Sequence, residues 1–402
     1  MGGAAKRMMH PYDNLDLTFS DMTRMIQGVA DGDITCFEKF DGTNLVWSVN
    51  DKGEPRYARK TDQTLTGGMS YDEFIFLLKG HPAEHIFSAG ARAVRDLTRT
   101  HGSPTDLEAN TWVNCEILLK DHPQMIRYDN DSIVLHKLMT PTKVGKKVVL
   151  TDVTPKFQRK WELFIMRAYI LGLRDWKVYG PMKLTVESTP EIVEAALTQL
   201  RTVSSKVDVE DPTLRDYLYS STVAALVYAA SVSEEHAHQL AENVTGRGRW
   251  KIRDIKSHYS PYVCGWIDKI ALSKNRDKWI NNVMMPVKKC WERFGASLLA
   301  ETCSTLIKDS DAGRERLRDL IAWNQLKLDF EYRDEYPQTR EEFHFHLSRF
   351  ESLNVAPPVS EGLVFSFEQN TYKVTGAFPS LNRATGAVRY EIGEMYDEKE
   401  TN

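Results

Sequence analysis

Residues 38–44 read Glu-Lys-Phe-Asp-Gly-Thr-Asn and lie between two stretches whose apolar side chains alternate along the chain. Phe37 precedes this heptapeptide, and Leu45, Trp47 and Val49 follow it at every second position. Such alternation is typical of β-strands. The Asp-Gly pair favours a sharp turn and lets the backbone approach a ligand. We therefore predict a strand, a tight turn and a second strand around this heptapeptide.

The heptapeptide also contains a candidate nucleophile. Lys39 lies on the first predicted strand, two residues before Asp41-Gly42. Its amine is suited to form a bond to the α-phosphorus of a nucleotide if it first loses a proton. Nearby cations and partial burial are therefore expected to lower the pKa of Lys39. The same residues also fit a surface lysine beside a hairpin turn, so the rest of the chain decides between the two interpretations.

Both helices and strands are predicted in the first part of the chain. Ser70-x-x-Glu73 forms a capping box before an apolar run, and a second helix is expected over 82–98. Strand patterns follow at residues 111–119, 132–138 and 147–153.

The second part of the chain changes from helices back to strands. The pattern is almost wholly helical from about 157 to 350, and Pro190 and Pro212 are each expected at a first helical position. Strands return at 361–367 and 371–378, around a predicted hairpin turn at Gln369-Asn370. This order indicates either one discontinuous domain with a helical insertion or three domains in series.

Composition excludes several classes of protein. The chain has 402 residues, of which 42% are hydrophobic and 27% charged, so wholesale disorder and fibrous structure are excluded. No apolar run approaches the roughly 20 residues that a bilayer crossing needs. The N-terminus lacks the apolar part of a secretion signal, and Lys6 departs from the myristoylation pattern. Five scattered cysteines contain no C-x-x-C pair, which fits a reducing compartment. We expect a cytoplasmic protein with no membrane partner.

Several motifs, taken in order, resemble those of a known superfamily. Lys39-Phe40-Asp41-Gly42 resembles motif I of the covalent nucleotidyltransferases, which are the ATP-dependent DNA and RNA ligases and the mRNA capping enzymes. With Glu38 and Asn44 included, the string looks most like the branch of one class of phage RNA ligase and the kinetoplastid RNA-editing ligases. Later segments resemble the remaining motifs in family order: Arg59 on the next strand, 112–116 (motif III), 133–138 (motif IIIa), 361–364 (motif IV) and 372–376 (motif V).

This resemblance implies roles for the residues of the heptapeptide. Lys39 would be the catalytic nucleophile, and Asp41 would orient it or a metal-bound water. Glu38 would help to read the edge of the base through its backbone. Gly42 and Asn44 would belong to the same nucleotide-binding motif.

It also implies roles for more distant residues. Arg59 would contact phosphate, and Glu116 would hold the ribose hydroxyls. Glu361 would bind nucleotide-associated Mg²⁺ directly or through water, since hard oxygen ligands suit that ion. Lys373 would be a second catalytic residue that neutralises charge on the α-phosphate. The implied cofactors are ATP and Mg²⁺.

Two departures from the family pattern affect the expected activity. Motif V usually carries two lysines one residue apart, whereas here Lys373 is followed by Thr375. Lys137, in the segment like motif IIIa, is a candidate to replace the missing cation in nucleotide binding. Residues 377–402 are too few for the C-terminal domain of the related ligases or capping enzymes. Self-adenylylation therefore fits this chain better than complete strand sealing.

A basic stretch lies within the helical block. Residues 247–293 contain 12 Lys or Arg and 4 Asp or Glu, with Trp and Tyr side chains interleaved. Basic and aromatic residues together suit nucleic-acid binding, through phosphates and base stacking. The alternative is a helical bundle whose aromatic residues are core and whose charges face solvent. The candidate contacts are Arg247, Arg249, Lys251 and Arg253.

The sequence thus predicts an α+β protein with a discontinuous domain. Residues 1–155 and 351–390 would form an antiparallel-sheet nucleotidyltransferase domain of the ATP-grasp-like ligase type, interrupted by a helical insertion at 156–350 and followed by an acidic tail at 391–402. Lys39 would accept AMP and pass it to a 5′-phosphate of a polynucleotide, with RNA favoured over DNA. The alternatives are transfer to a protein or an RNA cap, and a non-catalytic, virus-encoded binding or structural protein of the host cytoplasm that retains the fold.

Overall fold

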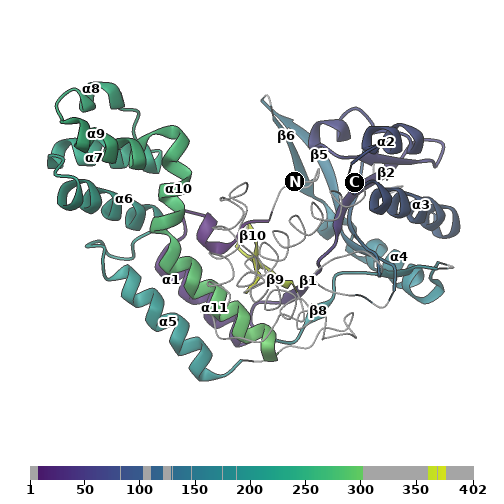
Figure 1. Ribbon diagram of the computed structural model, residues 1–402. Coiled ribbons are helices and arrows are strands. Elements are labelled where there is room, and N and C mark those ends of the chain that lie inside the picture. The colour runs from purple at the N-terminus through teal and green to yellow at the C-terminus, as the bar shows by residue number, and fades with distance from the viewer. Residues whose placement is uncertain are drawn as a thin grey trace, which may run out of the picture.

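The heptapeptide at residues 38–44 connects two separate β-sheets in a computed structural model of the protein (Figure 1). The structure describes residues 8–301 and 361–376, apart from residues 82, 103–109, 121–127, 129, 146, 174, 187 and 369. Strand β1 (Cys36–Lys39) ends at the lysine and β2 (Thr43–Val49) begins two residues after Asp41. Both strands were predicted, but they belong to different sheets and are not a hairpin.

Sheet I contains four strands in the order β10-β9-β1-β8, and each neighbouring pair is antiparallel. The predicted hairpin is formed by β9 (Gly362–Phe367) and β10 (Asn370–Val374). Its turn lies one residue earlier than expected, because Asn370 already pairs with Phe367 and Glu368 has a positive φ of 53°. Strand β1 therefore pairs on one side with a segment more than 300 residues away in the sequence, and on the other with β8 (Lys183–Leu184).

Sheet II has the order β3-β2-β4-β5-β6, with a short additional strand on β5. All pairs are antiparallel except β5 with β7, which is parallel. The predicted strands in this part of the chain all form: β3 (Pro55–Ala58), β4 (Trp112–Leu118), β5 (Ser132–Val144) and β6 (Lys147–Asp152). The additional strand β7 (Lys177–Tyr179) was not predicted.

Three helices cover one face of sheet II, namely α2 (Tyr71–Leu78), α3 (Glu84–His101) and α4 (Gln158–Leu171). The capping box that starts α2 forms as predicted. Ser70 Oγ accepts the Glu73 N–H at 3.3 Å, and the Glu73 carboxylate accepts the Ser70 N–H at 2.7 Å. The core below these helices includes Trp47, Phe74, Phe87, Ile117 and Trp161.

The remaining helices share one hydrophobic core with sheet I. In Figure 1 they form the left side of the molecule, with sheet I in the centre and sheet II on the right. This helical block consists of α1 (Phe19–Ala30), α5 (Pro190–Ser204), α6 (Leu214–Ala224), α7 (Glu234–Thr245), α8 (Ile252–Lys256), α9 (Pro261–Ala271), α10 (Ser273–Val283) and α11 (Met285–Glu301). Short 3-10 segments lie at Pro11–Asp13, Thr61–Thr64 and Thr154–Phe157, and a π-helical segment at Ala225–Ala229. The antiparallel sheets and flanking helices confirm the predicted α+β class.

Part of the region predicted as almost wholly helical is instead extended. Strands β7 and β8 lie within 177–184, where they extend sheets II and I. Each is too short to show a readable periodicity, and pairing with an existing strand stabilises it. Helix α5 begins at Pro190 as predicted. Helix α6 begins two residues after Pro212, because Thr213 is its N-cap and the Thr213 hydroxyl accepts the Asp216 N–H. Residues 302–350, the expected strand end at 377–378 and the acidic tail lie outside the described residues.

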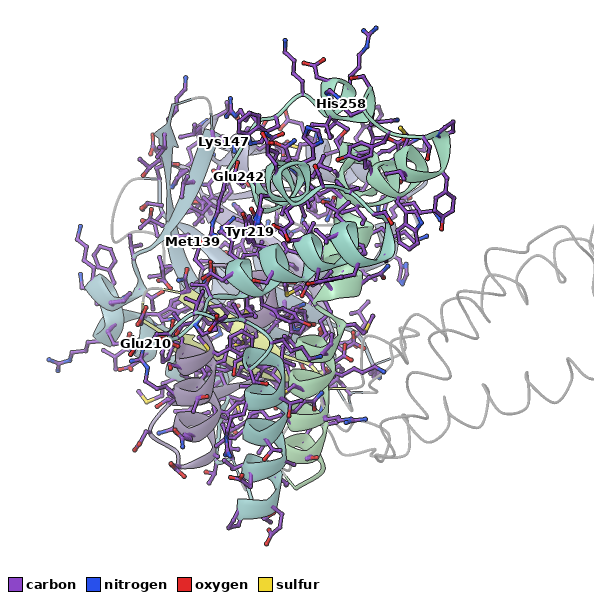
Figure 2. The ribbon with its side chains drawn as sticks, turned by 90° about the vertical axis from the view of Figure 1, so that its left-hand side faces the viewer. Met139, Lys147, Glu210, Tyr219, Glu242 and His258 are labelled. Carbon is purple, nitrogen blue, oxygen red and sulfur yellow. The ribbon has the colours of Figure 1, made fainter. Side chains whose placement is uncertain are left out.

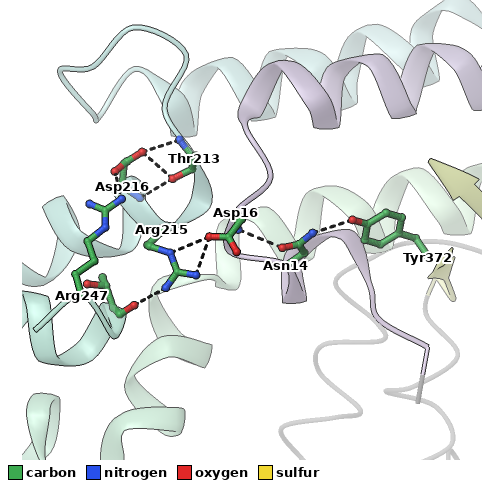
Figure 3. A network of polar contacts seen from close by, with 8 residues as sticks. Asn14, Asp16, Thr213, Arg215, Asp216, Arg247 and Tyr372 are labelled. Atoms are coloured by element: carbon green, nitrogen blue, oxygen red, sulfur yellow. Dashed lines mark hydrogen bonds and ion pairs between the residues drawn. The ribbon is translucent and has the colours of Figure 1, made fainter. Parts of the chain in front are cut away.

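A polar network ties the helical block to the last strand of sheet I (Figure 3). Asn14 donates from Nδ2 to the Tyr372 hydroxyl at 2.8 Å, and it also accepts the Asp16 N–H. Asp16 in turn accepts from the Arg215 guanidinium at 2.7 Å. Arg215 also donates to the carbonyl of Thr245 in α7. The segment before α1 therefore bridges β10 to α6 and α7.

The helical block also packs against β10 through a glycine. A Cβ atom at Gly295 of α11 would lie 2.3 Å from Val374 Cγ1 and 3.1 Å from the backbone nitrogen of Gly376. We predict that Gly295→Ala lowers the free energy of unfolding by about 1–3 kcal/mol through overpacking. Gly265 of α9 is the matched control, since a Cβ there meets nothing within 4 Å.

Gly265→Ala should raise the free energy of unfolding by about 0.5–1 kcal/mol, because alanine loses less conformational entropy in a helix. Urea denaturation followed by circular dichroism measures both changes. Equal effects of the two substitutions would contradict close packing between α11 and β10.

Candidate active site

Lys39 and Glu361 form a contact between the beginning and the end of the described chain. Strand β1 pairs with β9 so that Lys39 lies opposite Gly362, the residue after Glu361. Lys39 Nζ lies 2.5 Å from Glu361 Oε2, and both side chains are 14% exposed. Lys39 Nζ also donates to the Phe40 carbonyl at 3.2 Å. The structure therefore brings these two candidate site residues together.

The charges around Lys39 differ from the expectation. Burial disfavours the ammonium form of Lys39 and acts to lower its pKa. The negative charges of Glu361, Glu116 and Asp41 favour the ammonium form more strongly, so the pKa of Lys39 is raised. The sequence predicted a pKa lowered by nearby cations and partial burial; burial acts in that direction, but the neighbouring charges are negative and the net shift is upward. Because carboxylates predominate around the amine, Lys39 is held as the protonated partner of an ion pair.

Glu116 lies on β4 of sheet II, opposite Asn44 of β2. Burial acts to raise its pKa, but the charge of Lys39, the hydrogen bond to His136 and the Gly42 N–H together lower the pKa of Glu116. His136 Nε2 lies 3.1 Å from Glu116 Oε2. Glu116 is therefore held as a carboxylate by groups from both sheets.

The pKa of Glu361 is raised, in contrast to that of Glu116. Burial and the charge of Glu116 raise its pKa, and Lys39 and Lys373 offset this only in part. Lys373 lies on β10, opposite Val364 of β9, and its backbone N–H donates to the Met9 carbonyl at 2.9 Å. The positive charge of Lys373 acts on Glu361 and opposes the rise of its pKa.

The Asp41-Gly42 turn fits closely against β4. The Asp41 N–H donates to the Tyr128 hydroxyl at 2.8 Å. A Cβ atom at Gly42 would lie 2.6 Å from Glu116 Cγ and 2.9 Å from the Ile117 carbonyl oxygen, so a side chain there would displace β4. Glycine is therefore needed for the close approach of the turn to Glu116.

Asn44 and Glu38 occupy different surroundings on either side of this turn. Asn44 donates from Nδ2 to Asn114 Oδ1 at 2.7 Å and to the Cys115 carbonyl at 3.3 Å. Glu38 is 3% exposed, and its backbone N–H donates to the Met182 carbonyl at 2.8 Å. Asn44 thus belongs to the polar face of sheet II, whereas Glu38 is held in the interior of sheet I.

Two predicted residues are engaged elsewhere. The Arg59 guanidinium lies 4.3 Å from the centre of the Phe87 ring on α3, and burial lowers its pKa. Lys137 Nζ lies 4.0 Å from Asp152 Oδ2 and is about one-third exposed. Within the described part of the chain, neither side chain forms a hydrogen bond or an ion pair with Glu116 or Glu361.

His136 and Tyr128 belong to the site, although neither lies in a motif that indicated this role. His136 is the extra residue of a β-bulge, because the pairing of β4 with β5 shifts between Asn114, opposite Lys137, and Cys115, opposite Leu135. A polar residue out of phase with the buried Ile133 and Leu135 was the only available signal for His136. Tyr128 lies between strands, where no pattern indicated a contact.

The basic stretch in the helical block contains both paired and exposed residues. Arg247 donates to Asp216 Oδ1 at 2.7 Å, and this contact is part of the network in Figure 3. Arg249, Lys251 and Arg253 are exposed around α8, at the outer end of the block (Figure 1). The nearby helical face carries Tyr219, Glu242 and His258, which are labelled in Figure 2.

Most aromatic side chains of this stretch belong to the core instead. Trp291 is 1% exposed, and Trp266, Trp279 and Tyr259 pack against the same hydrophobic cluster. Trp250 and Tyr262, at 48% and 71% exposed, are the large aromatic residues of the stretch that face solvent. The alternative of a helical bundle with aromatic core residues therefore describes most of this stretch.

The described residues contain no group of three or more His, Cys, Asp or Glu side chains that could hold a metal ion. None of the helices in the described ranges combines the length and hydrophobicity that a bilayer crossing requires. Comparison with protein-family models, with curated proteins and with solved structures finds no match. The function is therefore inferred from the arrangement of the site.

We predict that Glu361→Gln lowers the pKa of Lys39, because it removes a carboxylate that raises it while the burial remains. The amine should then react with an acylating reagent at lower pH than in the wild-type protein. Competitive lysine labelling at a series of pH values, read by peptide mass spectrometry, measures this shift. Lys79, which is exposed at the C-terminal end of α2, serves as the internal reference. A Lys39 profile that does not move, or moves to higher pH, would contradict the electrostatic account.

Proposed function

We propose that the protein is an ATP-dependent nucleotidyltransferase of the RNA-ligase type, with Lys39 as the residue that becomes adenylylated. The observation that carries this proposal is the 2.5 Å contact between Lys39 and Glu361. It joins two segments that resemble motifs I and IV, and Glu116 and Lys373 from motifs III and V act on the same pair. Chance matches on unrelated surfaces would not be expected to meet at one place.

The proposed reaction requires Lys39 to change its protonation state and its contact with Glu361. The amine must lose a proton and leave Glu361 before Nζ attacks the α-phosphorus of ATP. A nitrogen–phosphorus bond then forms and the bond to pyrophosphate breaks. Turning Glu361 away from Lys39 favours both requirements, because the loss of a negative neighbour lowers the pKa of the amine.

The other residues around Lys39 have suitable chemistry for the nucleotide. The ionised Glu116 is an acceptor for ribose hydroxyls, and Lys373 brings positive charge toward the α-phosphate. Glu38 and Asn44 flank the turn, and the backbone of Glu38 would read the edge of the base. Arg59 would have to leave Phe87 to contact a phosphate, so its proposed role requires a side-chain movement.

Mg²⁺ fits this site only if phosphates of the nucleotide supply part of its coordination. The described residues provide no set of three protein ligands, but magnesium in nucleotide enzymes is commonly bound by one or two carboxylates and by phosphates. Glu361 is the carboxylate that would hold it. The ion would supply positive charge for the phosphates of ATP.

A second candidate function is nucleotide or RNA binding without transfer. Thr375 stands where the related ligases carry a second lysine, and it is 3% exposed. Its hydroxyl has no hydrogen-bond partner within the described ranges. Threonine carries no charge, so this position does not supply the cation of the second lysine. Together with a protonated Lys39, this observation favours a protein that retains the fold without the reaction.

The first step of the proposed reaction should leave a stable mark on the protein. We predict that incubation with Mg²⁺ and ATP labelled at the α-phosphate attaches one AMP, and that the label survives denaturation because the bond is covalent. Peptide mass spectrometry should place the AMP on Lys39. Lys39→Arg should abolish labelling, because the guanidinium remains protonated.

Lys79→Arg is the matched control and should label as well as the wild type, since Lys79 is exposed on another surface. Labelling of the Lys39→Arg protein would exclude Lys39 as the nucleophile. A folded wild-type protein that takes no label from ATP or GTP would support the second candidate function.

We also propose that the exposed cations around α8 bind the polynucleotide acceptor, for which RNA is the proposed class. Replacing Arg249, Lys251 and Arg253 with alanine should weaken RNA binding. It should also flatten the slope of log affinity against log salt by about three, one for each phosphate that is no longer neutralised. Arg247 is kept, because its ion pair with Asp216 supports the capped start of α6. Filter binding across a salt series measures both effects.

Alanine at Lys79, Arg92 and Arg99 is the control, because it removes the same charges from the outer surface of α2 and α3. The control should bind RNA normally, and both triple variants should retain Lys39 labelling. Equal RNA affinity in the two variants would assign the patch around α8 to an ordinary solvated surface.

A further inference from the structure

A row of polar side chains crosses three strands of sheet II on the face opposite its helices. Asn44 of β2 pairs with Glu116 of β4, and Asn114 lies two residues before Glu116 on the same strand. His136 of β5 reaches Glu116 from the other side. The intervening residues Cys115 and Leu135 point into the core below α3 and α4. The row therefore lies on the face that Lys39 shares with Glu116.

The contact between His136 and Glu116 has a defined direction. Glu116 is kept ionised by Lys39, His136 and the Gly42 N–H, so its oxygens can only accept hydrogen bonds. His136 must then donate from Nε2, across 3.1 Å to Oε2. The His136 side chain is 25% exposed and that of Glu116 is 13% exposed, so water competes only in part for this bond.

The β-bulge makes this contact possible. Val134 is the residue of β5 directly opposite Glu116, and His136 is two positions farther along. The shift of pairing at Asn114 leaves His136 as the extra residue of the strand, because Leu135 and Lys137 take the partners on either side. Bulges of this kind re-aim a side chain, and here the imidazole is aimed at Glu116.

We propose that His136 is a positioning residue that orients Glu116 for the ribose of the bound nucleotide. With one oxygen fixed by Nε2–H, the remaining acceptor positions of the carboxylate are directed toward the hydroxyls of the sugar. His136 thereby contributes to the choice of a ribonucleotide over a 2′-deoxyribonucleotide. This inference rests on the proposed function, because it assigns the ribose to Glu116.

Binding of AMP and 2′-deoxyAMP, measured by titration calorimetry, tests this role without requiring transfer to Lys39. His136→Leu should weaken AMP binding about tenfold and bring the two affinities close together, because it removes a hydrogen bond to a charged group. His136→Gln keeps a donor at a similar reach and should restore most of the preference. In the labelling reaction, His136→Leu should raise the ATP concentration for half-maximal rate more than it lowers the rate at saturation.

A double-mutant cycle separates positioning from a general structural effect. In a Glu116→Ala background, His136→Leu should cause no further loss of AMP binding, since its effect passes through Glu116. His85→Leu, a replacement of the same kind at an exposed position of α3, should leave both affinities unchanged.

Three results would overturn the inference. These are an unchanged preference for AMP in a folded His136→Leu protein, additive losses in the cycle, and a wild-type protein that binds neither mononucleotide. A wild type that prefers AMP over 2′-deoxyAMP but takes no label would refute the transferase proposal alone. The two proposals therefore fail in distinguishable ways.

Discussion

The contact between Lys39 and Glu361 places a constraint on the whole described structure. Both side chains are largely buried, and removing one member of a buried ion pair typically costs about 3–5 kcal/mol. The two residues meet because β1 pairs with β9, so the central strand of sheet I depends on a segment from the far end of the chain. Strand β9 is held in turn by β10 and by the packing of α11 around Gly295. The helical block thus supports the strand pairing that the ion pair requires.

The heptapeptide extends this constraint to the second sheet. Lys39 ends one strand and Thr43 begins another, so the chain passes from sheet I to sheet II within the intervening turn. Gly42 allows that turn to lie against Glu116, where a Cβ atom would collide. As a result, an amine from one sheet and a carboxylate from the other act on each other, although the two sheets have separate cores. Sites supported by strands in this way are held more firmly than sites on loops.

Sequence reasoning predicted the features that depend on local signals. The capping box at Ser70 and Glu73 identified the start of α2, and strand patterns identified β2 to β6 of sheet II but not the short β7. A single domain made of residues 1–155 and 351–390 requires its two parts to meet, and the pairing of β1 with β9 brings Glu361 beside Lys39. The sequence did not indicate that β1 and β2 belong to different sheets, because alternation within a strand does not specify its partner strand. The bulge that brings His136 to Glu116, and the predominance of carboxylates around Lys39, likewise depend on contacts between distant segments.

The interaction that organises the structure also opposes the proposed chemistry. An amine attacks phosphorus only when it is unprotonated, yet the carboxylates that hold Lys39 in place favour its ammonium form. A site that kept Lys39 permanently deprotonated would leave Glu361 as a buried charge without its cation, which is the costlier arrangement. A more economical solution is to keep the pair closed without nucleotide and open it when the charges of the substrate arrive. The resting ion pair is then compatible with catalysis, provided that Glu361 finds another cation at the moment Lys39 is released.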